Sequence, residues 1–299
     1  PRSTQGVSSA ASDVYKRQVF GIPGTHNLAV YEGLAGQSDV THILARHEQG
    51  AGFMADGYAR ASGGVGVCLS TTGPAALNVL TPLGTAFADS VPVLSIASEI
   101  PSRGLGLGKG FLHECVDQLG CYSPVTKFSA RVTEVEAIVP TLCSAIAAIT
   151  SGRPRPAAID IPCDILDAEG IAGDTVPEDV AGSGSDDQAI HRVAEVLDSA
   201  QRPLIWAGGG VVRSGGFAAL ARLAERLDAP VFRLFSAKGR CRPITHCRPA
   251  KDCSIRPRVI CGLIATCCSR WAPVSDLSLI HISEPTRRTP ISYAVFCLK

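Results

Sequence analysis

A regular alternation of short apolar runs with longer helical runs is the feature that most constrains the fold. The apolar, β-branched runs are THILA (41–45), VGVCLS (65–70), VPVLSIAS (91–98) and AAIDIP (157–162). Helical runs lie between them at 75–90 and 133–152. Short buried strands that alternate with helices are typical of a parallel sheet with right-handed crossovers. The sequence therefore predicts an α/β fold with a doubly wound parallel sheet.

Boundary signals accompany the helical run 133–152. Thr133 and Glu136 have the spacing of a capping box, in which two side chains bond to main-chain N–H groups at a helix start. Gly152, with a proline two residues later, indicates the helix stop. Pro140 cannot lie inside an undistorted helix, so we expect the helix to begin near 140 or to kink there.

A second, incomplete α/β unit follows a linker. Residues 168–186 are rich in Gly, Asp and Ser, as linkers are. The expected elements after it are a helix over 186–200, a strand over 202–210, a helix over 215–229 and a strand over 230–236. We therefore expect residues 187–239 to form the truncated start of another doubly wound domain.

Composition narrows the class of protein. The 299 residues leave room for about two domains. Hydrophobic residues make up 45% of the chain, charged residues 18%, and the net charge is +1, which indicates no nucleic-acid partner. No apolar run approaches the roughly 20 residues of a membrane helix, and no signal-peptide pattern is visible. The five cysteines before residue 240 read as free thiols, so we expect a cytoplasmic protein without a membrane partner.

Both ends of the chain differ in residue composition from the rest. Residues 240–299 hold seven of the 12 cysteines, without the paired spacing of a zinc site. Their abundant Arg, Cys and Pro are what GC-rich codons give when read out of frame, and 277–299 resembles translated sequencing adapter. Residues 1–18 resemble the same contaminant, the alternative being a disordered leader such as a transit peptide. We expect 1–18 to be a non-native leader and 240–299 a frameshifted and adapter-derived tail.

Four strings carry a family resemblance. They are VFGIPGTHNLAVYEGL (19–34), HEQGAGFMADGYAR (47–60), STTGPAALN (70–78) and GRPRPAAIDIPCDIL (152–166). In this order they resemble the thiamine-diphosphate-dependent 2-oxo-acid enzymes of the acetolactate synthase type. The resemblance implies that 19–167 is the pyrimidine-binding domain and that 187–239 begins the central domain.

The resemblance also implies a role for Glu48. In the family, one carboxylate bonds to nitrogen N1′ of the cofactor pyrimidine and favours the imino tautomer, whose 4′-nitrogen acts as internal base. By its residues alone, Glu48 could equally be a helix N-terminal acid favoured by the helix dipole. The TTGP turn (71–74) could by itself bind phosphate at a helix N-terminus, whereas the resemblance places it against the pyrimidine ring. With Glu48, the expected cofactor-binding residues are Gly21, Pro23, Gly24, Thr72, Gly73, Pro74 and Asn78, although Asn78 could instead be a helix cap.

His113 is the second catalytic candidate. It lies in GKGFLHECVDQLG (108–120), where the family places active-site side chains. Acetolactate synthases usually have Gln at this place, while guanidino-oxo-acid decarboxylases have Leu-His-Glu. The resemblance therefore implies a substrate such as pyruvate and decarboxylation followed by carboligation, with a related decarboxylase as the alternative. For His113, the competing interpretation is a solvent-facing loop histidine. For the whole chain, it is a non-catalytic nucleotide-binding protein.

The resemblance also raises the questions of FAD binding, Mg²⁺ binding and oligomeric state. WAGGGVVRSGG (206–216) resembles a dinucleotide-binding turn, and we favour a structural role while FAD binding stays open. The family's Mg²⁺ ligands belong to a third domain whose motif is absent from this sequence, so we assign no metal ligand here. Full-length members are homodimers or homotetramers whose active site includes a partner subunit. We expect the chain as given to be an inactive fragment.

Overall fold

The computed structural model describes residues 17–170, 187–201, 203–233, 279–282 and 294–297. The chain divides into two compact units, 1–183 and 184–299. Nearly all of the predicted leader and linker, and most of the predicted tail, lie outside the described residues. No helix in the described ranges has both the length and the apolar character that crossing a bilayer requires.

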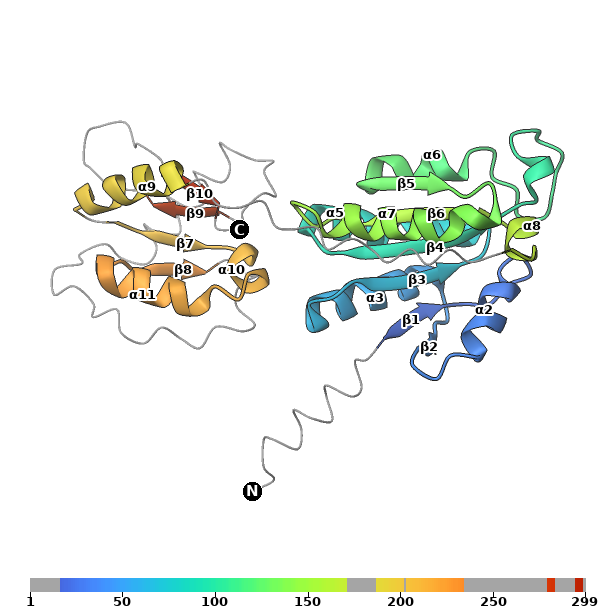
Figure 1. Cartoon of the computed structure of the whole chain (residues 1–299), viewed down its shortest axis with the longest axis horizontal. Helices are drawn as coiled ribbons and strands as arrows, with labels where there is room; N and C mark the ends of the chain where they lie inside the picture. Colours follow the sequence, from blue (N-terminus) through green and yellow to red (C-terminus); the bar gives the residue numbers. More distant parts are fainter. Residues whose placement is uncertain (1–16, 171–186, 202, 234–278, 283–293, 298–299) are drawn as a thin grey trace, which may run out of the picture. The chain divides into compact units, whose positions relative to one another are not determined.

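The first unit is built on a six-stranded sheet in the order β2-β1-β3-β4-β6-β5, and every neighbouring pair is parallel (Figure 1). Its strands are β1 Gln18–Gly21, β2 Thr41–Leu44, β3 Gly66–Ser70, β4 Val93–Glu99, β5 Phe128–Arg131 and β6 Ala157–Pro162. The predicted doubly wound parallel sheet is confirmed. The strands β1 and β5 were not among the predicted runs, because QVFG and FSAR are short and carry few β-branched residues.

The helices of this unit are α2 Leu28–Ala35, α3 Glu48–Ser62, α4 Pro74–Asn78, α5 Leu80–Asp89, α6 Gln118–Tyr122, α7 Ile138–Thr150 and α8 Cys163–Leu166. Three short 3₁₀ turns, η1 Ser102–Gly104, η2 Ser123–Val125 and η3 Val135–Ala137, lie between them. The helix predicted over 75–90 is two helices, which are divided at the buried Val79.

The helix predicted over 133–152 begins later than expected, after a 3₁₀ turn. The capping-box prediction is wrong: η3 forms first, α7 then follows Ala137, and neither start has a side-chain cap. Pro140 lies in the first turn of α7, where a missing N–H removes no helical bond. The stop signal is confirmed, because α7 ends at Thr150 and Gly152 has a φ of +54°.

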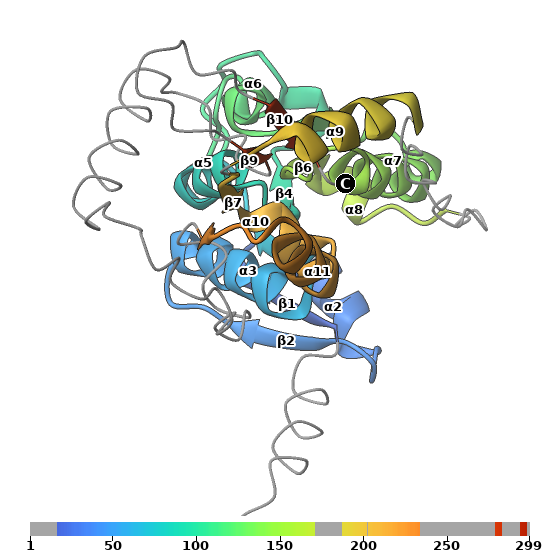
Figure 2. The same ribbon diagram turned by 90° about the vertical axis from the view of Figure 1, so that its left-hand side faces the viewer.

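The sheet has a core on each face, and Figure 2 shows α3 and α5 on one side with α7 on the other. Small residues let α3 approach the sheet closely, since Ala51, Ala55 and Ala59 are all buried. A Cβ on Gly66 of β3 would collide with the carbonyl oxygen of Ala55. The small residues of α3 therefore bring its first residue, Glu48, close to the sheet edge.

The second unit contains α9 Asp187–Ser199, β7 Ile205–Ala207, α10 Gly209–Arg213, α11 Phe217–Leu227 and β8 Val231–Arg233. Strands β7 and β8 are parallel. The strand predicted over 202–210 is shorter because α10 begins at Gly209. Two further strands, β9 Leu279–Ile282 and β10 Ala294–Cys297, pair with each other, and β9 pairs with β7. Both lie within residues 240–299, for which no helix or strand was predicted.

Candidate active site

The carboxyl ends of the parallel strands meet at one edge of the sheet. After β1 the chain crosses to β2 on one side, and after β2 it crosses back to β3 on the other side of β1. Ligands of open α/β sheets bind at such a switch point, outside the carboxyl ends of the strands. All predicted site residues follow one of these strand ends: Gly21, Pro23 and Gly24 close β1, Glu48 follows β2, Thr72, Gly73, Pro74 and Asn78 follow β3, and His113 follows β4.

Glu48 is the first residue of α3 and is half-buried. His47 caps this helix, its Nδ1 accepting from the main-chain N–H of Gln49 at 3.1 Å. The Nδ2 of Asn78 donates to Oε2 of Glu48 at 3.0 Å. Asn78 is the last residue of α4, so its amide orients the carboxylate instead of capping a helix start. The second oxygen, Oε1, makes no hydrogen bond with a described residue and can take a ligand.

The turn after β1 is closed from within. Asn27 is buried, and its Oδ1 accepts from the N–H of Gly24 at 2.7 Å while its Nδ2 donates to the carbonyl of Ile22 at 3.3 Å. A Cβ on Gly21 would lie 2.5 Å from the carbonyl oxygen of Leu69 in β3. Glycine is therefore needed at Gly21 for β1 to pack against its neighbour, with or without a ligand.

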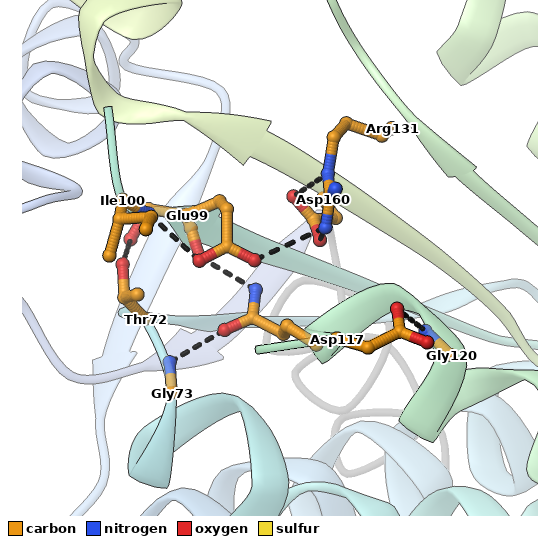
Figure 3. Close-up of polar contacts among 10 residues, drawn as sticks. Thr72, Gly73, Glu99, Ile100, Asp117, Gly120, Arg131 and Asp160 are labelled. Carbon is orange, nitrogen blue, oxygen red and sulfur yellow. Dashed lines mark hydrogen bonds and ion pairs between the residues drawn. The ribbon is translucent and has the colours of Figure 1, made fainter. Parts of the chain in front are cut away.

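The turn after β3 is fixed by its own chain (Figure 3). Gly73 has a φ of +58°, and a Cβ there would collide with the carbonyl oxygen of His113. Its N–H donates at 2.6 Å to Oε1 of Gln118, which is fully buried and donates in turn to the carbonyl of Ser98 at 2.9 Å. Pro74 has no N–H. Gly73 and Pro74 therefore have no N–H left for a phosphate, which disfavours the alternative of a phosphate-binding turn.

Thr72 contacts His26, which was not among the predicted site residues. The Thr72 Oγ1 lies 3.0 Å from Nδ1 of His26 and 3.2 Å from Oγ of Ser98. The ring of His26 stands edge-on to that of His113, with centroids 6.3 Å apart. Burial, followed by the charge of His113, lowers the pKa of His26. The signal was available, since His26 stands directly after the GIPGT turn of the first motif.

Behind the turn lie two fully buried carboxylates, Glu99 at the end of β4 and Asp160 in β6 (Figure 3). The guanidinium of Arg131 reaches Asp160 at 2.8 Å and Glu99 at 3.3 Å. The N–H of Ile100 donates to Glu99 at 2.8 Å. Burial is the main cause that raises the pKa of Glu99 to about 7, and the charge of Asp160 adds to it while Arg131 opposes it. Burial also raises the pKa of Asp160. The cluster is therefore able to hold a proton near neutral pH.

The donor set fits the pyrimidine end of thiamine diphosphate. A ring nitrogen needs one oriented carboxylate, and Glu48 has an oxygen left after its bond to Asn78. The turns at Gly24 and Gly73 are closed by the chain itself, since a Cβ on Gly24 would lie 3.0 Å from the side chain of Thr71 and one on Gly73 would collide with the carbonyl oxygen of His113. No three His, Cys, Asp or Glu side chains of the described ranges stand close enough together to hold a metal ion.

Comparison with known proteins agrees with this geometry. The sequence family described as thiamine pyrophosphate enzyme, N-terminal TPP binding domain, matches residues 4–121, and the central domain of the same enzymes matches 190–245. The probable 2-ketoarginine decarboxylase AruI of Pseudomonas aeruginosa is 48% identical over 224 residues, which is 74% of this chain and 39% of the relative.

Two acetolactate synthases are also similar. The probable large subunit of Methanocaldococcus jannaschii is 40% identical over 76% of this chain and 39% of its own length. The isozyme 1 large subunit of Escherichia coli K12 is 35% identical over 74% of this chain and 39% of its own length. The chain thus spans about two fifths of the curated relatives it matches. With its parallel sheet and its carboxylate at the start of α3, the chain belongs to the thiamine pyrophosphate enzymes of the acetolactate synthase-like family.

Proposed function

We propose that this chain forms the pyrimidine-binding wall of an enzyme that uses thiamine diphosphate to act on a 2-oxo acid such as pyruvate. The observation that carries the proposal is Glu48, which Asn78 orients at the carboxyl edge of the sheet. Bound thiamine diphosphate would supply the electron sink for decarboxylation. Glu48 would hold a proton at the pyrimidine nitrogen through Oε1, while Gly21, Pro23, Gly24, Thr72, Gly73 and Pro74 shape the wall beside it.

The reaction that we place first is decarboxylation followed by carboligation, as in the relatives named acetolactate synthase. A simple 2-oxo-acid decarboxylase is the second candidate. His113 at the site and the 48% identity to a probable 2-ketoarginine decarboxylase favour that candidate. In either reaction His113 would hydrogen-bond the substrate carboxylate or move a proton. Product analysis with pyruvate and with a guanidino-oxo acid separates the two.

The proposal also includes a metal ion, a partner subunit and a cellular location. We infer that Mg²⁺ anchors the diphosphate through oxygen ligands of a third domain and that a homodimer or homotetramer completes the site. We infer a cytoplasmic location. For the turn that begins α10 at Gly209 we favour a structural role, with FAD as the alternative ligand. Equilibrium dialysis with FAD distinguishes these, and a thermal-shift screen with FAD, ADP and NAD tests the competing idea of a non-catalytic nucleotide binder.

The decisive experiment replaces the matching region of the P. aeruginosa decarboxylase with residues 19–233 of this chain. Exchange of the cofactor C2 hydrogen for deuterium then reports activation directly. We expect the parent chimera to exchange, and Glu48→Gln to slow the exchange by about 10²-fold, the usual effect of a positioned acid–base group. Glu134→Gln, on the exposed segment before η3, is the matched control and should exchange like the parent. Equal exchange in Glu48→Gln and the parent would refute the assignment.

The isolated chain should release no CO₂ from pyruvate, even with thiamine diphosphate and Mg²⁺ present. One wall cannot orient the cofactor, and orientation supplies roughly 7–11 kcal/mol of catalysis. The assay is CO₂ release by the purified chain, with the chimera as the positive control. Turnover by the chain alone would show that the described residues hold a complete site.

A further inference from the structure

Gln118 links the turn after β3 to the interior of the sheet (Figure 3). Its side chain is fully buried, and its Oε1 accepts from the N–H of Gly73 at 2.6 Å. Its Nε2 donates to the carbonyl of Ser98 at 2.9 Å, and the amide also donates to the carboxylate of Asp160. A reversed amide would set donor against donor at Gly73 and oxygen against oxygen at the other two partners. The amide of Gln118 therefore has a single orientation.

Asp160 joins Gln118 to a second buried acid. Glu99 and Asp160 are both fully buried, and the hydrogen bond between their carboxyl groups requires a proton on one of them. Arg131 faces the pair, at 2.8 Å from Asp160 and 3.3 Å from Glu99. One guanidinium balances one carboxylate, so two ionised acids would leave an uncompensated negative charge in the core. The contacts of this cluster are complete only while it holds one proton.

No second cation compensates for the loss of that proton. Three other titratable side chains of the described residues act on the cluster, and none of them carries a positive charge: Cys115, Asp117 and Tyr122. Without the proton, the hydrogen bond between Glu99 and Asp160 becomes a repulsion of like charges. Because Asp160 is also a partner of Gln118, this repulsion disturbs the amide that holds Gly73.

We propose that Gln118 is a positioning residue of the site, which holds the turn at Gly73 firmly only while Glu99 and Asp160 share a proton. This inference rests on the proposed function, in which that turn lies beside the cofactor. In the step, the O–H bond of Glu99 breaks, its electron pair stays on the carboxylate, and the proton passes to solvent water. The affinity for the cofactor therefore falls as pH rises through the titration of the acid pair.

The first test follows the amide of Gly73 in the full chain by hydrogen exchange and NMR, with the protection factor taken at each pH. Its protection should fall by about 10-fold between pH 5 and 8, because one hydrogen bond weakens as Glu99, whose pKa is about 7, loses its proton. Glu99→Gln keeps a donor to Asp160 and should hold the protection constant. Gln118→Met should lower it at every pH, and Gln118→Glu should restore it only in acid. Gln37→Met, exposed after α2, is the matched control and should follow the parent.

A reference amide separates this effect from unfolding of the whole unit. The N–H of Val91 bonds to the carbonyl of Ala86 at 2.9 Å, before β4 and at the opposite end of that strand from Glu99. We expect the protection of Gly73 to fall by about 10-fold more than that of Val91. Constant protection of Gly73 in the parent, or an equal fall at both amides, would overturn the positioning role.

The second test measures the affinity of the chimera described above for thiamine diphosphate, by titrating C2 exchange with the cofactor at each pH. Between pH 5 and 8 the parent should lose about 10-fold more affinity than Glu99→Gln does. Gln118→Met should raise the half-saturating cofactor concentration by about 10-fold and change the maximal rate much less, since Glu48 governs that step. Equal pH dependence in the parent and Glu99→Gln would overturn the link to the cofactor. A parent chimera without exchange counts instead against the proposed function, and the Gly73 result then decides the role of Gln118.

Discussion

The buried acids behind the turn make the first unit sensitive to pH. Glu99 is fully buried, and its pKa is raised from 4.5 to about 7, chiefly by burial. A carboxyl group with a raised pKa binds its proton more tightly in the folded state. The contribution of Glu99 to stability is therefore fully present below pH 4.5 and is lost as pH rises through about 7. The shift corresponds to about 3 kcal/mol, at 1.36 kcal/mol for each pH unit.

Glu99→Gln should remove this dependence. The glutamine carbonyl can accept from the N–H of Ile100, and its amide can donate to Asp160 as a protonated Glu99 would. Arg131 keeps its 2.8 Å pair with Asp160. We therefore expect the variant to unfold with nearly constant free energy between pH 5 and 8, while the parent loses about 2.5 kcal/mol over the same range.

The assay must report the first unit alone, since the chain has two units. Urea unfolding followed by deuterium pulse labelling of peptides from β4 and β6 does so at each pH. Glu134→Gln removes an exposed carboxyl of the same unit and should follow the parent. A flat parental profile, or a variant with the parental slope, would refute the argument from burial.

Two other variants test the turns. Gly73→Ala should lower the stability of the first unit by about 1–3 kcal/mol, because it combines a positive φ with a collision at the carbonyl of His113, and a lowered urea midpoint of the β3 peptide measures this. Asn78→Ala should cost only about 1 kcal/mol of stability. It should slow C2 exchange in the chimera by about 10-fold, because Glu48 loses its orienting hydrogen bond. A parental exchange rate would contradict this role of Asn78.

The sequence predicts the parts of the fold that depend on local pattern. Four strands of the sheet, β2, β3, β4 and β6, coincide with β-branched runs, because buried parallel strands require such residues. Strand β5 carries the sequence FSAR and shows no such pattern. It is a strand because it pairs with β6, which is a property of the assembled sheet. The capping box failed for a similar reason, since a 3₁₀ turn takes the place where the helix was expected to begin.

Side-chain contacts between distant strands could not be predicted in this way. Asp160 reads as an interruption of the apolar run AAIDIP, and its partner Arg131 stands 29 residues earlier. The two meet because β5 and β6 pair in a register that sets Arg131 opposite Asp160. His26 and Thr72 are 46 residues apart and meet only because β1 lies beside β3. Motifs located Glu48 and Asn78, whereas the strand order was needed to locate their neighbours.

The contacts behind the TTGP turn also explain how a glycine-rich turn can avoid binding phosphate. A phosphate site at a helix N-terminus needs free N–H groups directed at the ligand. Here the N–H of Gly73 is used by Gln118, and Pro74 offers none. The carbonyl of His113 fills the space that a Gly73 side chain would occupy. Neither Gly73 nor Pro74 therefore has an N–H left for a phosphate, which favours a packing role for this turn over a phosphate site.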